Sequence, residues 1–189
     1  MVLYLFIIGF SMAAVFAANG VYAAIAGASV WAVFGMVWGD ALALFLLDAL
    51  FATAIHFALP KKWFDPYRKI YRAGKRERRF YNALRIVRWK DKIPETGKLI
   101  GQFDKTKVAG LEADYLFLFL RETCYAEIIH YAMLLLPSLI VPLCHALIFS
   151  GSSFRLYVWT LALPCAFVNF ALQIPPIFVQ RFNRPRLLR

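Results

Sequence analysis

Apolar residues in this chain gather into four long stretches separated by polar segments. The stretches cover about residues 2–25, 30–59, 123–149 and 154–179. Each is long enough to cross a bilayer, because roughly 20 helical residues span the hydrocarbon core of about 30 Å. The pattern predicts an all-α integral membrane protein, with four transmembrane helices forming a single membrane domain over residues 1–189.

The composition agrees with this prediction. Hydrophobic residues make up 61% of the 189 residues and charged residues only 17%, which is unusual for a soluble domain. The three cysteines, Cys124, Cys144 and Cys165, form no CxxC motif and no metal-ligand spacing with histidine. The sequence therefore predicts neither a metal site nor a disulfide framework.

The positive charge is concentrated in two places. Of the 22 Lys and Arg residues, 16 lie between Lys61 and Lys107 and four in the last nine residues. This clustering is typical of the positive-inside rule rather than of nucleic-acid binding. We therefore expect a multi-pass protein of the cell membrane, with the loop 60–122, the tail 180–189 and both termini cytoplasmic, and no nucleic-acid partner.

The loop 60–122 carries apolar residues at helical spacing between its basic residues. Phe80, Leu84 and Val87 fall on one predicted stripe, flanked by arginines. Such a pattern predicts interfacial amphipathic helices in contact with membrane lipid. Pro94 and Gly97 are expected to end this helical region.

One candidate site lies at the start of the third apolar stretch. Glu127 and His130 are three residues apart, which places both on one face of a helix. A carboxylate beside an imidazole can fix its tautomer and raise its basicity, as a general base requires. A structural Glu–His pair that holds helices together is an equally good interpretation.

A second candidate site follows the fourth stretch. The segment contains Gln180, Arg181, Asn183, Arg184 and Arg186. Arginine binds phosphate in a bidentate fashion, so this segment could hold phosphates or sugar hydroxyls. Composition alone favours the other interpretation, a basic stop sequence touching anionic headgroups.

Four other ionisable residues lie within the apolar stretches. Asp40 and Asp48 are eight residues apart and broadly on one side of a helix. They could be protonated and structural, or could line a cavity. His56 and His145 stand alone in the sequence, and we expect both to be packing or interface residues.

Several of these segments resemble a known family. Trp89-Lys90, Glu122-Thr123, Ala126–His130 and Gln180–Leu187 occur in this order and are similar to segments of the glycosyl-4,4'-diaponeurosporenoate acyltransferases. The resemblance covers about residues 55–187 and leaves the first apolar stretch without a counterpart. It implies a membrane enzyme that esterifies a fatty acyl chain onto the sugar of a glycosylated carotenoid acid, the last step of staphyloxanthin assembly.

The resemblance suggests roles for the candidate residues. His130, oriented by Glu127, would be the general base for a hydroxyl of a glycosylated isoprenoid or lipid acceptor. The acyl donor would be acyl-CoA or another acyl thioester, a co-substrate rather than a resident cofactor. The predicted substrate-binding residues are Arg181, Asn183, Arg184, Arg186, Gln180, Trp89, Lys90 and Glu122.

Two other functions compete with acyl transfer. A lipid-modifying membrane reductase would need a nicotinamide pocket, and the sequence offers no glycine-rich turn for one. A non-enzymatic lipid-binding or assembly protein would use the arginines for headgroups and the Glu127–His130 pair for structure.

Overall fold

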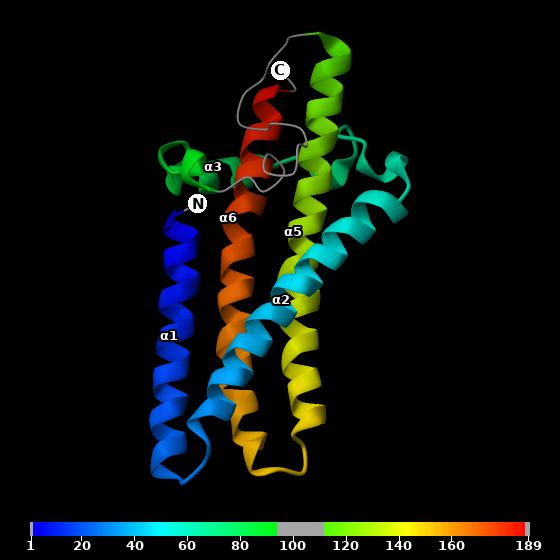
Figure 1. Cartoon of the computed structure of the whole chain (residues 1–189). Coiled ribbons are helices and arrows are strands. Elements are labelled where there is room, and N and C mark those ends of the chain that lie inside the picture. The colour runs from blue at the N-terminus through cyan, green and yellow to red at the C-terminus, as the bar shows by residue number, and fades with distance from the viewer. Residues whose placement is uncertain (1, 94–111, 188–189) are drawn as a thin grey trace. The chain divides into compact units, whose positions relative to one another are not determined.

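The chain forms four long helices joined by short helical segments. The structure is a computed structural model that describes residues 2–93 and 112–187. Figure 1 shows the long helices, which are α1 (Val2–Ile25), α2 (Val30–Ala58), α5 (Ala113–Ile148) and α6 (Leu163–Leu187). Four segments are long and apolar enough to cross a membrane: Val2–Ile25, Val30–Ala58, Ala113–Ile148 and Phe154–Leu187. The predicted all-α fold with four membrane helices is confirmed.

The ends of the last two long helices differ from the prediction. Helix α5 begins at Ala113, well before the predicted start at Thr123. Helix α6 continues through the predicted tail to Leu187. The α5 extension agrees with the helical pattern of residues 111–120, which leads into the third stretch. Hydropathy misses the α6 extension because buried ion pairs of Arg181 and Arg184, described below, neutralise its polar turns.

Short helices form the described part of the predicted loop 60–122. They are η1 (Lys61–Phe64), η2 (Lys69–Tyr71), α3 (Lys75–Ala83), η3 (Ile86–Arg88) and η4 (Lys90–Lys92). The prediction that Phe80, Leu84 and Val87 lie on one helix is wrong. Helix α3 ends at Ala83, and Arg85 has a left-handed backbone with φ of 52°. All three apolar side chains are nevertheless exposed. The predicted stop at Pro94 and Gly97 lies outside the described residues.

Prolines inside the long helices explain several contacts between helices. Pro137 has no N–H for the carbonyl of Met133 four residues earlier, and Asn169 Nδ2 donates to that oxygen at 3.0 Å. Pro164 likewise frees the carbonyl of Thr160, which accepts from Asn19 Nδ2 at 2.8 Å. A neighbouring helix thus satisfies backbone groups that lipid could not.

Tyr4 makes a similar bond at another proline. Its hydroxyl donates to the carbonyl of Leu172 at 3.4 Å, and Leu172 lies four residues before Pro176. Between α5 and α6 the chain forms η5 (Ser153–Leu156) and η6 (Val158–Ala162), the second of which is a π-helix. Polar side chains and proline positions therefore join α1, α5 and α6.

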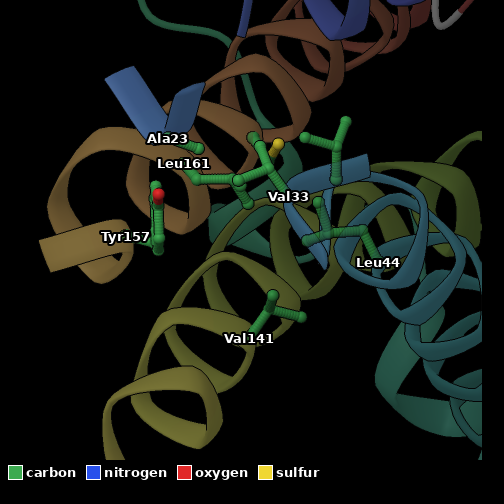
Figure 2. Close-up of a cluster of buried hydrophobic side chains, with 8 residues drawn as sticks. Ala23, Val33, Leu44, Val141, Tyr157 and Leu161 are labelled. Atoms are coloured by element: carbon green, nitrogen blue, oxygen red, sulfur yellow. The ribbon is translucent and has the colours of Figure 1, made fainter. Parts of the chain in front are cut away.

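The described residues divide into two compact units. Unit 1 contains residues 53–93, 112–131 and 174–187, and unit 2 contains residues 2–52 and 132–173. Figure 2 shows the apolar core of unit 2, where side chains from α1, α2, α5, η6 and the start of α6 meet. The buried members of this core are Ala23, Val33, Val37, Leu44, Val141, Tyr157, Leu161 and Cys165.

Unit 1 has a smaller core of its own. Tyr81, Ile86 and Phe182 are buried together, with Trp89, Phe178 and Val179 packed against them. The ring of Phe64 also stacks on Tyr125, with a centroid distance of 3.7 Å. These contacts fix the short helices after α2 against α5 and α6 within unit 1.

Candidate functional site

Unit 1 is organised around a buried carboxylate with two arginines. Glu127 on α5 is 1% exposed, and Arg184 on α6 is 0% exposed. Arg181 Nη1 donates to Glu127 Oε1 at 2.5 Å, and Arg184 Nη1 donates to Glu127 Oε2 at 2.7 Å. Arg181 and Arg184 are three residues apart, so one face of α6 presents both guanidinium groups to the same carboxylate.

Arg184 uses its remaining donors on the protein. Its Nε donates to Thr123 Oγ1 at 3.0 Å, its Nη2 to the Thr123 carbonyl at 3.0 Å and its Nη1 to the Tyr71 carbonyl at 2.9 Å. The guanidinium also lies over the Tyr71 ring, 5.2 Å from the centroid. A buried charge is tolerated when paired and hydrogen-bonded in this way, so Arg184 ties η2 to α5 and α6.

Glu77 on α3 completes the cluster. Arg181 contacts it through both Nε and Nη2, the second at 3.1 Å, which is the bidentate geometry of a strong ion pair. The Tyr81 hydroxyl donates to Glu77 Oε1 at 2.6 Å, and the Gly74 N–H donates to Oε2 at 3.3 Å. We call Glu77, Glu127, Arg181 and Arg184 the arginine–glutamate network.

Glu77 is not among the site residues predicted from the sequence. The signal was present, because Glu77 is the one acidic residue between Arg68 and Lys90, within a run of basic residues. Helix capping also accounts for a Glu three residues after Gly74. No pattern indicated that its partner would be Arg181, which lies 104 positions away.

The network changes the acid–base properties of α3 and its surroundings. Burial alone would raise the pKa of Glu77, but hydrogen bonds from Arg181 and Tyr81, with the arginine charge, lower it overall. Burial raises the pKa of Tyr71 to about 12, with the Glu127 charge among the smaller contributions. Burial and the bond to Glu77 raise the pKa of Tyr81 as well. At neutral pH Glu77 is therefore ionised and both phenols are neutral.

The structure brings some of the predicted site residues together. Glu127, Arg181 and Arg184 are bonded in the network. Trp89 packs against the small core of unit 1, and its Nε1 donates to the Leu84 carbonyl at 3.0 Å. Arg186 lies 3.9 Å from the Phe182 ring centroid.

The other predicted residues also lie in unit 1. Lys90 pairs with Asp91 at 2.9 Å. Gln180 is buried, whereas Asn183, Glu122 and His130 are partly buried.

In the structure, the predicted partner of His130, Glu127, is bonded to two arginines. Both oxygens of Glu127 accept hydrogen bonds from arginine, so Glu127 is the counter-ion of the guanidinium groups. His130 follows one helical turn later on α5. The catalytic role of the pair, and substrate contact by Arg184, remain predictions. Among the described residues, no group of three or more His, Cys, Asp or Glu side chains is placed to hold a metal ion.

Comparison with known proteins identifies a family. The model of a family described as glycosyl-4,4'-diaponeurosporenoate acyltransferase matches residues 60–189. No curated protein and no solved structure matches the chain. The matched region contains all four residues of the network, whereas α1 and α2 precede it.

Proposed function

We propose a specific acyl transfer for this chain, which belongs to the glycosyl-4,4'-diaponeurosporenoate acyltransferase family. Membership makes it an acyltransferase of carotenoid biosynthesis, and its four apolar helices make it a membrane protein. We infer that it moves a fatty acyl group from an acyl thioester, such as acyl-CoA, to a sugar hydroxyl of a glycosylated isoprenoid. The reductase and non-enzymatic alternatives do not fit this family.

The arginine–glutamate network is the observation that supports this site. It joins α3, α5 and α6 within unit 1 and lies wholly within the family match. It thereby holds the turn of α5 that carries His130 and the segment of α6 from Gln180 to Arg186 in one compact unit. Orienting two amphiphilic substrates beside a fixed base is a large part of what such a reaction needs.

In the proposed mechanism, His130 acts as general base. Its imidazole accepts the proton of the acceptor hydroxyl while the hydroxyl oxygen bonds to the thioester carbonyl carbon. The C–S bond then breaks, and the imidazolium returns the proton to the leaving thiolate. General-base assistance of this kind contributes about 10²–10⁴-fold to the rate.

The arginines divide into two proposed roles. Arg184 is fully buried and Arg181 is 14% exposed, and both are bonded to Glu127, so we assign them to positioning. Arg186 is exposed near the end of α6, with Asn183 one turn before it. We assign Arg186 and Asn183, together with Gln180, Glu122, Trp89 and Lys90, to binding the donor phosphates or the acceptor sugar.

We further propose that the short helices after α2 lie in the headgroup region on the cytoplasmic side. Exposed apolar side chains alternate there with basic ones, and they are Trp63, Tyr67, Ile70, Phe80, Leu84 and Val87. Such a mixture suits an anionic membrane surface. In this orientation the site faces the cytoplasm, the side on which loops rich in Lys and Arg are found.

Acyl transfer by membranes containing the protein tests this function. Labelled acyl-CoA and a glycosylated carotenoid acceptor should yield an ester with the wild-type protein. We expect His130→Ala to lower the rate by about 10²-fold or more. His56→Ala is the matched control, because His56 lies in the same unit and packs on Tyr125 at 5.1 Å between centroids. Full activity of His130→Ala would contradict the assignment of the base.

A further inference from the structure

Unit 2 contains two carboxylates inside a membrane-spanning helix. In the ranges 2–52 and 132–173, Asp40 and Asp48 are the acidic residues and Arg155 is the one Lys or Arg. Arg155 is exposed in η5, between the last two spans. A carboxylate in a membrane span is costly unless a partner or a proton neutralises it. Unit 2 must therefore stabilise these groups without a lysine or arginine partner.

The two aspartates have different neighbours. Asp48 Oδ2 accepts from Gln173 Nε2 at 3.0 Å, and Gln173 also donates to Asn169 Oδ1 at 3.3 Å. An amide N–H does not give up its proton, so Asp48 is held by a fixed hydrogen bond. Asp40 instead faces the imidazole of His145, whose Nδ1 lies 3.3 Å from Oδ2 and 3.4 Å from Oδ1. Imidazole is a group that gains and loses a proton near neutral pH.

The Asp40–His145 pair also has unused polar atoms. His145 is 4% exposed, and in the part of the chain that the structure describes its Nε2 has no hydrogen-bond partner. Asp40 Oδ2 also makes no hydrogen bond there. The Phe149 ring covers the imidazole at 4.6 Å between centroids. A buried imidazole with one nitrogen on a carboxylate and the other unpaired has the arrangement of an acid–base dyad.

We propose that Asp40 and His145 form a proton-binding dyad inside the membrane-spanning part of unit 2. The pair takes up one proton from the aqueous buffer, whose O–H bond breaks as the new N–H or O–H bond forms, and the net charge of the pair changes from −1 to 0. The protonated dyad exists in two forms, either aspartate with imidazolium or aspartic acid with neutral imidazole, so the proton belongs to the pair rather than to one residue. Because lipid and the apolar core (Figure 2) solvate charge poorly, proton binding stabilises the packing of α2 against α5.

Unit 2 contains other titratable side chains among its described residues. Cys165 on α6 lies within the electrostatic influence of Asp40, and Tyr157 belongs to the same buried core. On α2, Asp48 is eight residues along the helix from Asp40 and is held by Gln173. Cys144, next to His145 in the chain, is exposed.

Nitrogen NMR of the full-length protein in lipid nanodiscs tests the dyad. The chain has three histidines, so ¹⁵N-histidine labelling gives few signals, and His145→Gln identifies the one of interest. We expect this signal to respond to pH in the folded protein, and Asp40→Asn to shift the midpoint of that response. Asp48→Asn, on the same helix, is the matched control and should shift the midpoint by much less.

Two results would overturn the proposal: a His145 signal that does not titrate in the folded protein, or one that Asp40→Asn leaves unchanged. Should Asp40→Asn fail to fold, infrared difference spectra of the wild type give a second answer. A carboxyl band that changes with pH and is absent from His145→Gln supports the dyad, and no such band contradicts it. Neither measurement involves acyl transfer, so the outcome is independent of the proposed function.

Discussion

At the scale of single residues, Glu127 is the shared ion-pair partner of two arginines in unit 1. Replacing it with Gln leaves the buried Arg184 and its neighbour Arg181 without their shared counter-ion. Removing one partner of a buried ion pair costs about 3–5 kcal/mol. We expect Glu127→Gln to lower the free energy of unfolding by this amount, measured by denaturation in detergent micelles. Asp91→Asn is the control, because Asp91 forms an exposed pair with Lys90 and should cost less than about 1 kcal/mol.

Glu77 predicts a dependence of stability on pH. Its pKa in the folded protein is lowered below the ordinary value of 4.5, so the unfolded chain takes up a proton first as the pH falls. Its stabilising contribution is complete above pH 4.5 and is lost as the pH drops through the lowered value. The difference in melting temperature between wild type and Glu77→Gln should therefore shrink below pH 4.5. A difference that stays constant down to pH 3 would contradict this.

Individual side-chain roles were only partly predictable from the sequence. The arginines at the end of α6 were predicted as a group, to bind phosphates or sugar hydroxyls or to touch anionic headgroups. Nothing in the sequence indicated that two of them would pair with Glu127. Glu77 and the Asp40–His145 pair were missed because their partners lie 104 and 105 positions away. His145 was expected to be a packing or interface residue, and its contact with Asp40 depends on tertiary structure that periodicity does not encode.

At the scale of helices, length and apolar character were predictable because lipid imposes both on a spanning segment. The extension of α6 to Leu187 was not, since its last turns are stabilised by the bonds of Arg181 and Arg184 rather than by hydropathy. The break after α3 was not predictable either, because arginine gives no sequence signal for the left-handed conformation that Arg85 adopts.

The proline in α5 allows a test of how helices in unit 2 are joined. Asn169→Leu removes the donor to the Met133 carbonyl, and we expect it to cost about 0.6–1.7 kcal/mol, as for other hydrogen bonds between membrane helices. Pro137→Ala restores a helical N–H for the same carbonyl. Asn169→Leu should therefore cost less in the Pro137→Ala background, which a double-mutant cycle of unfolding free energies measures. Equal costs in the two backgrounds would show that the hydrogen bond to the Met133 carbonyl does not account for the stabilising effect of Asn169.

At the scale of the whole molecule, the distribution of charge predicts the orientation of the chain. Basic residues between α2 and α5 and at the end of α6 should lie on the cytoplasmic side, with the connection between α5 and α6 on the other. Cysteines introduced one at a time at Lys75 and Ser152, in a variant with Cys124, Cys144 and Cys165 replaced, report this directly.

We expect a membrane-impermeant thiol reagent to label Ser152→Cys in intact cells and Lys75→Cys only after the membrane is opened. Both positions are exposed in the structure, so a lack of labelling in opened membranes would indicate misfolding and is checked first. The reverse pattern would place the arginine–glutamate network on the outer face, away from cytoplasmic acyl-CoA. That result would not contradict acyl transfer by this family. It would mean that the acyl donor comes from outside the cell, because an active site on the outer face cannot bind a thioester that is in the cytoplasm.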